Sequence, residues 1–562
     1  IDIQQLRTSY FASVGNYYDL YIDLLMQLHK QNPKAGYDAL ALQASERARA
    51  RSLLEMLIET SVDIRQGIAP ELLEKERSLQ QQLNDKTEYQ IRLLNRNHTI
   101  EQIEAIHKET EKLNEELQKV EAQIRRDNPH YAALKYPQPL SLTEIQQQVL
   151  DADTLLLEYA LGEEHSYLWA VTVTSMTSFE IPKRADVERA ALRVYELLTA
   201  RERRRFETDK KLLARIKEAD ADLPIAMAVL SHMLLGPVVE QLGRKRLLIV
   251  SEGLLQYIPF AALPIPTDNR KSKTYPSPDT KPLIIEHEII NLPSITTLAV
   301  QRRELAGRKA ALKTIAIFAN PVFSVADTRV KSVSTRANEK LYRKSVDSVD
   351  SLLTELVPLP ETEQMAKEII ALMPSEQCKL STGFDANLIT ATAPELSQYS
   401  IIQYTTHGFL NYKPELSGIV LSLVNKQGKE QKGFLSTAAI FNLKLSADLV
   451  VLSACQTGLA WDPLNIGKSN DPRIFKKIKD QGFTGLTRGF VYAGTARVMV
   501  SLWNIRVRAT TKLLVRFYKE MLGPRKLSPA AALRAAQIYM WKQTKWKAPY
   551  YWAAFVISGE YK

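Results

Sequence analysis

Apolar side chains recur every three or four residues through the first 135 positions, the spacing of helices that bury one face. Leu20, Leu24, Leu25 and Leu28 follow it before a break at residues 33–36, and a second helix is predicted after the break. Farther along, two heptad-like series predict a helical hairpin. We favour an antiparallel arm within the chain over an intermolecular coiled coil, because each half is short. The later series is Ile103, Ile106, Thr110, Leu113, Leu117, Val120 and Ile124, and the earlier one includes Leu72, Leu79 and Leu83.

The pattern changes at Pro137 and Pro139, where short apolar runs begin to alternate with helical stretches. This alternation predicts an α/β fold with a mostly parallel sheet flanked by helices, whose functional residues lie at the carboxyl ends of the strands. The predicted strands are 154–160, 167–173, 246–250, 283–290, 314–318, 401–404, 418–423, 449–452 and 498–502. The predicted helices are 186–213, 224–242, 361–372, 482–492 and 510–521.

At 562 residues the chain is too long for one hydrophobic core, and we expect three regions. Residues 1–135 form the helical region, 136–308 a first α/β layer, and 309–562 a second α/β domain. The first residue is Ile1, so we expect a processed or truncated product. The longest apolar stretch, 225–239, contains Ser231, His232, Gly236 and Pro237 and is too short for a membrane span, so none is predicted.

Composition is that of a globular protein, with 45% hydrophobic and 24% charged residues. The net charge of +11 permits an acidic partner without identifying one. There are only two cysteines, Cys378 and Cys455. This number suits a reducing cytoplasm, provides no disulfide framework and excludes a CxxC zinc motif.

Two predicted strands end at reactive side chains. The strand 401–404 runs to His407 and Gly408, and the strand 449–452 runs to Cys455, 48 residues after the histidine. A spacing of about 50 residues between His and Cys is found in caspases. An imidazole can take the proton of a thiol, and the thiolate can then attack a peptide carbonyl. The backbone N–H groups of Gly408 and Cys455 could form the oxyanion hole.

Each of these residues also has a purely structural interpretation. A cysteine at a buried strand end is commonly a small hydrophobic residue, and a lone histidine is commonly structural. Glycines near both strand ends favour the catalytic interpretation of the pair.

Many ordered motifs across residues 137–562 resemble the CHAT domain, a caspase-like peptidase domain often found after tetratricopeptide repeats. The segment 44–50, ASERARA, resembles the last repeat helix before such a domain. The CHAT-like motifs are 154–159 (TLLLEY), 248–253 (LIVSEG), 258–263 (IPFAAL), 359–362 (LPET), 404–410 (YTTHGFL), 447–458 (ADLVVLSACQTG), 501–504 (SLWN) and 549–555 (PYYWAAF).

The resemblance implies a cysteine endopeptidase with His407 as base and Cys455 as nucleophile, and no cofactor or metal. The family includes a member from filamentous cyanobacteria linked to heterocyst differentiation, and effectors switched on by RNA-guided complexes. Separases share the catalytic fold and carry a degenerate copy of it. By that analogy, residues 140–308 are expected to be a non-catalytic α/β layer of the pseudo-protease kind.

The loop after Trp503 departs from the acidic sequence expected beside a pocket for a basic side chain. It carries Arg506 and Arg508, which would favour an acidic residue at P1, the position before the cleaved bond. Alternatively both arginines are solvated, and Asp327 or Asp462 recognises a basic P1 residue. We expect a basic P1, because most related peptidases outside the caspases prefer it.

The segment 461–479 is longer and more basic than the glycine-rich loop expected there. Its cations Arg473, Lys476, Lys477 and Lys479 form a candidate processing site, as caspases are cut between the cysteine and the pocket loops. A mobile surface loop is an equally good interpretation.

The sequence thus predicts a cytoplasmic cysteine endopeptidase whose protein substrate docks on the helical N-terminal region. No membrane association is expected, nucleic acid would take part only indirectly, and the oligomeric state is unknown. One alternative is a protease-derived adaptor that acts by binding alone. Another is an effector held inactive until a nucleic-acid complex binds the helical arm.

Overall fold

The computed structural model describes residues 3–59, 139–204, 207–266, 281–331, 356–409, 418–453, 484–503 and 506–562, and short stretches between 69 and 124. These residues form two compact units. One comprises Ile1–Arg49 and Leu140–Lys562, and the other comprises Ala50–Pro139. The first 49 residues therefore join the α/β unit, whereas the sequence-based division grouped them with the rest of 1–135.

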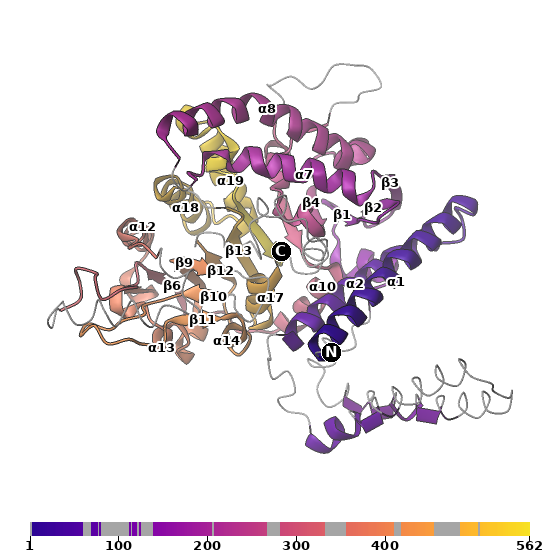
Figure 1. Cartoon of the computed structure of the whole chain (residues 1–562), viewed down its shortest axis with the longest axis horizontal. Coiled ribbons are helices and arrows are strands. Elements are labelled where there is room, and N and C mark those ends of the chain that lie inside the picture. Colours follow the sequence, from indigo (N-terminus) through magenta and orange to yellow (C-terminus); the bar gives the residue numbers. More distant parts are fainter. Residues whose placement is uncertain are drawn as a thin grey trace. The chain divides into compact units, whose positions relative to one another are not determined.

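Figure 1 labels the main helices and strands of the larger unit. Its helices are α1 (Ile3–Gln31), α2 (Tyr37–Glu59, of which residues 50–59 belong to the smaller unit), α6 (Leu142–Glu144), α7 (Arg184–Leu198), α8 (Asp209–Leu235), α9 (Val239–Leu242), α10 (Ile295–Leu305), α12 (Pro360–Ile370), α13 (Leu388–Ala391), α14 (Thr437–Phe441), α17 (Thr484–Tyr492), α18 (Val507–Leu522) and α19 (Pro529–Trp541). Its strands are β1 (Thr154–Ala160), β2 (Ser166–Val171), β3 (Met176–Ile181), β4 (Arg246–Val250), β5 (Ile289–Leu292), β6 (Lys313–Ala319), β7 (Cys378–Thr382), β8 (Tyr399–Thr405), β9 (His407–Phe409), β10 (Gly418–Val420), β11 (Phe434–Ser436), β12 (Leu449–Leu452), β13 (Arg497–Ser501) and β14 (Phe555–Gly559).

One sheet of eleven strands runs through this unit in the order β3-β2-β1-β4-β5-β14-β13-β12-β8-β6-β7. Strands β1, β4, β5 and β14 are mutually parallel, as are β13, β12, β8, β6 and β7. The two blocks meet at the antiparallel pair of β13 and β14, so they run in opposite directions and their carboxyl ends lie at opposite edges of the sheet. Strands β9, β10 and β11 form a separate small antiparallel sheet.

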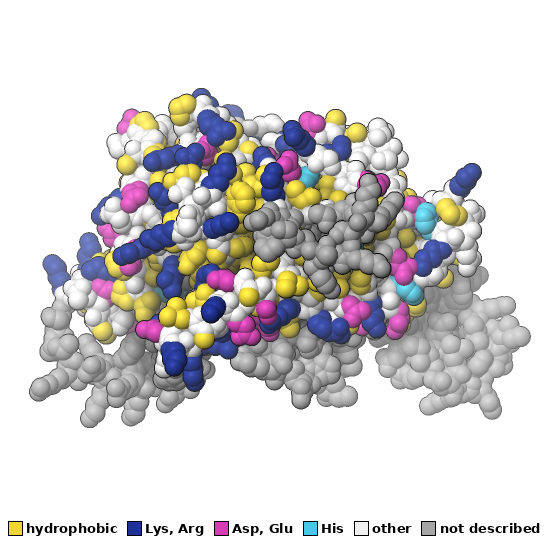
Figure 2. All heavy atoms as spheres, turned by 90° about the horizontal axis from the view of Figure 1, so that it is seen from above, with side chains coloured by type: hydrophobic (Ala, Val, Ile, Leu, Met, Phe, Trp, Pro, Cys, Tyr) yellow, Lys and Arg dark blue, Asp and Glu magenta, His cyan; other side chains and the backbone are white. Residues whose placement is uncertain are grey.

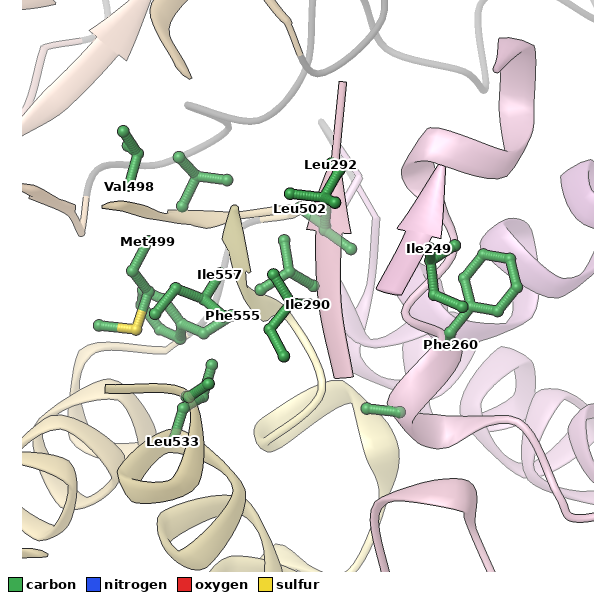
Figure 3. Packing of buried hydrophobic residues seen from close by; sticks show 14 of the residues in the cluster. Ile249, Phe260, Ile290, Leu292, Val498, Met499, Leu502, Leu533, Phe555 and Ile557 are labelled. Carbon is green, nitrogen blue, oxygen red and sulfur yellow. The ribbon is translucent and has the colours of Figure 1, made fainter. Parts of the chain in front are cut away.

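Helices cover both faces of the sheet. Figure 1 shows α7, α8, α18 and α19 on one side and α10, α14 and α17 on the other. Helix α18 buries Leu513, Leu514 and Phe517, the spacing expected of a helix with one face in the core. In Figure 3, Met499, Phe555 and Ile557 point from the centre of the sheet toward Leu533 of α19, and all four are almost completely buried. The core is therefore continuous where the two strand blocks meet.

Three side chains of α2 fix this helix to the sheet. The Ser45 hydroxyl donates to Glu158 Oε1 at 2.7 Å, and Arg49 lies 3.3 Å from the same oxygen. The Glu46 carboxylate accepts the backbone N–H groups of Ile295 and Thr296 at the start of α10, at 3.1 and 2.7 Å. A carboxylate at a helix N-terminus satisfies donors that the helix itself leaves unpaired. The ASERARA segment thus joins the N-terminal helices to the sheet.

In the smaller unit, Leu79 packs with Val120 and Ile124, and Leu72 and Leu113 pack against them. These are members of the two heptad-like series, so the two series contact each other. Leu83, Ile103, Ile106 and Thr110 lie outside the described residues.

The fold class is confirmed: a helical N-terminal region is followed by a large, mostly parallel sheet flanked by helices.

Three element predictions were wrong. The run 283–290 is a 3-10 helix (Leu283–Ile285) and then β5, because Pro282 starts a turn there. The stretch 186–213 is two helices, since Arg215 donates to the carbonyl oxygens of Ala200 and Glu202 in the turn between them. Helix α8 also continues through Pro224, where a new helix was expected to start.

The region Asp209–Leu242 meets length and composition criteria for a membrane span, which the sequence analysis did not predict. Yet one face of α8 belongs to the same buried core as the sheet. The residues of this face are Leu223, Met227, Leu230, Leu234 and Leu235. Core helices of this kind pass the same criteria, so the helix is weak evidence for a membrane.

Candidate functional site

The strands that lead to His407 and Cys455 are parallel neighbours. Tyr404 of β8 is paired with Leu452 of β12, and the Ser453 backbone N–H donates to the Tyr404 carbonyl at 2.9 Å. His407 comes three residues after Tyr404, and Cys455 comes three residues after Leu452. Cys455 itself lies outside the described residues. The register brings the two chain segments to the same edge of the sheet at the same height.

His407 is held by the small sheet that begins at this edge. It is the first residue of β9, opposite Val420 of β10, and the Thr406 hydroxyl donates to the Val420 carbonyl at 2.6 Å. Gly408 lies next along β9, opposite Ile419. The oxyanion role predicted for the N–H groups of Gly408 and Cys455 stays a prediction.

The His407 ring has a defined orientation. Its Nε2 lies 2.8 Å from the Val357 carbonyl oxygen. Because a carbonyl can only accept, Nε2 carries the proton and Nδ1 is the acceptor of the neutral ring. The ring also packs against Phe323, with ring centroids 5.1 Å apart. Burial lowers the pKa of His407 from its ordinary value, although the hydrogen bond to Val357 acts in the opposite direction. A neutral imidazole at pH 7 is the form that a general base requires.

The segment that supplies Val357 is fixed by the LPET motif two residues later. The Thr362 hydroxyl donates to the Leu359 carbonyl at 2.6 Å and accepts the Asn320 N–H at 3.1 Å. Asn320 directly follows β6 and has a φ of 48°, and its side-chain amide donates to Glu363 at 3.0 Å. This motif therefore ties the start of α12 to the end of a central strand. Sequence reasoning missed Val357, because a backbone carbonyl carries no side-chain signal.

Asp327 is already engaged by a neighbouring cation. Its carboxylate accepts Arg329 Nε at 2.8 Å and Nη2 at 2.6 Å. These hydrogen bonds lower the pKa of Asp327. Arg329 also donates to the Asn320 carbonyl at 2.8 Å, so the pair fastens the end of β6. Asp327 does not present a free carboxylate to a substrate in this arrangement.

The other predicted pocket residues fall into three groups. Arg506 and Arg508, at the start of α18, are exposed. Trp503 is fully buried, donates from Nε1 to the Tyr550 carbonyl at 3.0 Å and packs against Tyr195. It has no exposed surface to line a pocket, which corrects that prediction. Asp462 lies outside the described residues, as do the candidate processing residues Arg473, Lys476, Lys477 and Lys479.

The first strand block, made of β1, β4, β5 and β14, has its own carboxyl edge, which can be compared with the edge that carries His407. Glu158 of β1 is paired with Val250 of β4, so the residues three positions onward are Leu161 and Gly253. Neither can act as base or nucleophile. A Cβ at Gly253 would lie 2.3 Å from the Glu188 carboxylate.

Ion pairs fill this second edge. Arg184 lies 2.7 Å from Glu252 and 3.2 Å from Glu188, and Glu252 accepts the Leu161 N–H at 2.7 Å. Arg49 of α2 donates to the Ser251 carbonyl at 3.2 Å. The corresponding edge of the first block is therefore occupied by ion-paired side chains, and the positions equivalent to His407 and Cys455 are Leu161 and Gly253.

Among the described residues, no group of three or more His, Cys, Asp or Glu side chains is arranged to hold a metal ion. The second cysteine, Cys378, is a free thiol on β7 whose pKa is raised by burial. A raised pKa disfavours the thiolate, as expected of a structural cysteine.

The sequence matches the CHAT domain family over residues 225–560, more than half of the chain. It is 26% identical to human tetratricopeptide repeat protein 28 over 344 residues, which cover 58% of this chain and 12% of that protein. Identity to the mouse protein of the same name is 30% over 125 residues, covering 22% of this chain and 4% of the relative. The chain thus spans a small part of these relatives.

Among solved structures, the Saccharomyces cerevisiae separase–securin complex at 3.0 Å resolution matches with a TM-score of 0.43 and 10% identity. That match covers 98% of this chain and 46% of the other. At such a score the likeness carries no weight beside the sequence match.

Proposed function

The chain belongs to the CHAT domain family, and from this membership and the geometry at His407 we propose that it is a cysteine endopeptidase. Cys455 is the nucleophile and His407 the general base. The observation that carries the proposal is the register of β8 and β12. Tyr404 is paired with Leu452, and His407 and Cys455 each come three residues after one member of this pair. In support, the nitrogen of His407 that faces away from Val357 is a proton acceptor.

In the proposed reaction, His407 Nδ1 takes the proton of the Cys455 thiol, and the sulfur attacks the carbonyl carbon of the scissile bond. The N–H groups of Gly408 and Cys455 stabilise the negative oxygen of the tetrahedral intermediate. The imidazolium then protonates the leaving amine, and the C–N bond breaks. Water hydrolyses the thioester and regenerates the thiol, so no cofactor is consumed.

For P1 we retain the expectation of a basic residue. Since Asp327 is paired with Arg329, Asp462 is the remaining predicted carboxylate. The exposed Arg506 and Arg508 supply the alternative, an acidic P1. A peptide-library cleavage profile decides between them. Cleavage after Lys or Arg supports the basic preference, and cleavage only after Asp or Glu overturns it.

The substrate is proposed to be a protein partner docked by the helical N-terminal region in the cytoplasm, and cleavage is proposed to be regulatory. Support comes from the contacts of Ser45, Glu46 and Arg49, which join this region to the sheet. If α1 holds the partner, Leu20→Glu/Leu24→Glu, at two exposed leucines of this helix, should abolish cleavage of the partner but spare short peptides that the library identifies.

The decisive experiment compares the wild type with Cys455→Ala and His407→Ala on library peptides and on partners captured with Cys455→Ala. Cys378→Ala is the matched control, because it removes the other cysteine. We expect both dyad variants to lose at least about a thousandfold in kcat/KM while the control retains full activity. Partner binding and biology unchanged in both dyad variants would favour the adaptor instead. Activity that appears only on addition of an RNA-guided complex would favour the nucleic-acid-activated effector.

Processing within 461–479 is tested separately by intact mass. If this segment is a processing site, the wild type is cut after Arg473, Lys476, Lys477 or Lys479 on incubation, and Cys455→Ala stays intact. Identical masses would mean that the chain does not process itself.

A further inference from the structure

A cavity of about 440 Å³ opens between the last turns of α18 and one face of α19. Its floor is aliphatic, formed mainly by Leu527, Ala535 and Ile538, and its rim carries Arg516, Arg525, Arg534 and Lys542. The size lies in the range of sites that take small ligands or a few side chains of a peptide. Figure 2 shows the wider surface seen from above, where Lys and Arg side chains alternate with hydrophobic ones.

The rim has an excess of positive charge. Glu520 is its single acidic lining residue and is only 4% exposed. It lies 2.7 Å from Arg525 and is also paired with Arg516. Four cations thus face one carboxylate that is already compensated, which leaves the cavity attractive to negative charge.

Two of the cations are held in position before any ligand arrives. Arg534 Nε donates to the Ile284 carbonyl at 2.8 Å, and the Arg516 guanidinium lies 4.8 Å from the ring centroid of Tyr539. Such preorganisation lowers the entropy lost when a ligand binds. Arg525 and Lys542 are exposed, and Arg525 also holds the ion pair with Glu520.

The aliphatic floor distinguishes between two kinds of acidic ligand. Single-stranded nucleic acid binds to aromatic faces on which bases stack. The aromatic ring lining this cavity, Tyr539, is already covered by Arg516 and by Lys512, whose Nζ lies 5.6 Å from the ring centroid. A peptide offers both carboxylates for the rim and a branched aliphatic side chain for the floor, so it fits both surfaces.

We propose that this cavity binds an acidic peptide segment of a partner protein, with a leucine-like side chain on the floor and carboxylates on Arg525, Arg534 and Lys542. The cavity is distinct from the candidate catalytic site. Arg516 lies ten residues after Arg506, which corresponds to about 15 Å along α18. The proposal does not depend on proteolysis, and it gives part of the +11 charge a function.

The probe is a fluorescein-labelled peptide in which Glu and Asp residues flank a central Leu, titrated with the full chain and followed by fluorescence anisotropy. We expect Arg525→Glu/Lys542→Glu to weaken binding by about tenfold or more, because both contacts become repulsive. Lys519→Glu/Lys547→Glu is the matched control, since it makes the same charge change at exposed positions that do not line the cavity and should leave binding unchanged. Ala535→Phe fills the floor and should weaken binding by a similar factor without altering net charge.

Further measurements separate the contribution of the acidic side chains from that of the leucine, and distinguish a peptide ligand from nucleic acid. A peptide with Gln and Asn in place of the acids, or Ser in place of Leu, should bind at least about tenfold more weakly. Thermal melts establish that each variant is folded. Equal affinity of the wild type and the charge-reversed variant, or no binding of the acidic peptide, would overturn the proposal. Tighter binding of an oligouridine probe that depends on Arg525 and Lys542 would also overturn it and identify the cavity as a nucleic-acid site.

Discussion

The imidazole Nε2 of His407 lies 2.8 Å from the carbonyl oxygen of Val357. This contact joins the end of β8 to the segment before α12, and it selects the tautomer in which Nδ1 accepts a proton. The orientation of the proposed base thus depends on a residue fifty positions earlier in the chain.

The environment of His407 predicts a depressed pKa. Burial beside Phe323 disfavours the charged imidazolium, so the pKa should lie below 6.5, and Phe323→Ala should raise it by admitting water. The measurement is an NMR titration in the Cys455→Ala background, with His407→Ala to assign the signal. Phe441→Ala, a buried aromatic truncation that should leave the His407 signal unchanged, is the control. A pKa at or above 6.5 in the parent would contradict this prediction.

Glu46 should be essential for attaching α2. Its carboxylate accepts Ser294 Oγ and two backbone N–H groups, so Glu46→Ala leaves buried donors unpaired and should cost about 3 kcal/mol or more. Urea unfolding measures the change in the free energy of unfolding. Arg47→Ala, at the adjacent exposed position, should stay within about 0.5 kcal/mol of the wild type. A small effect of Glu46→Ala would mean that α2 is not held through this contact.

Glu158 should make the protein less stable as pH rises. Burial, with the nearby Glu46 carboxylate, raises its pKa from 4.5 to about 8. The folded chain therefore keeps a proton that the unfolded chain loses, and stability should fall as pH rises from 4.5 toward 8. In Glu158→Gln this contribution is absent, so the Tm should change less over the same window. Parallel Tm curves for the wild type and Glu158→Gln would refute the assignment, and Glu180→Gln, at an exposed position of β3, is the control.

Gly253 should tolerate a side chain poorly. Its φ is +56°, and an added Cβ would meet the Glu188 carboxylate of the Arg184 ion pair. Gly307 has a φ of +76° but nothing within 4 Å of an added Cβ, so Gly307→Ala measures backbone strain alone, about 1 kcal/mol. We expect Gly253→Ala to be more destabilising by about another 1 kcal/mol, as read from urea unfolding. Equal losses would show that Glu188 moves aside freely.

Much of the eleven-stranded sheet could be predicted from the sequence. Residues 449–452 are apolar throughout, the signature of a strand buried on both faces, and the strand has these bounds in the structure. β1 and β4 likewise have the predicted bounds. Such apolar runs also predicted that His407 lies at the carboxyl edge of the sheet, because the carboxyl ends of neighbouring parallel strands lie at the same edge.

The rest depended on contacts distant in sequence. Strands β3, β7 and β14 were not predicted, and the reversal of direction at β13 and β14 joins segments whose local patterns do not indicate orientation. The split between α7 and α8 depends on Arg215 reaching back to Ala200 and Glu202. Similarly, Trp503 was predicted to line a pocket but is buried, because it packs against Tyr195, which is 308 residues away in the chain.

The opposed directions of the two strand blocks set a minimum reach for any docked substrate. Arg49 attaches α2 near Ser251, at the carboxyl edge of the first block, whereas His407 lies at the carboxyl edge of the second. Four strand spacings of about 4.8 Å and, at right angles to them, one strand length of about 17 Å separate β4 from the end of β12, which together make about 25 Å. A polypeptide anchored near Arg49 would therefore need at least about seven extended residues between its anchor and its scissile bond. If the chain cleaves a docked partner as proposed, shortening that spacer should stop cleavage without weakening attachment.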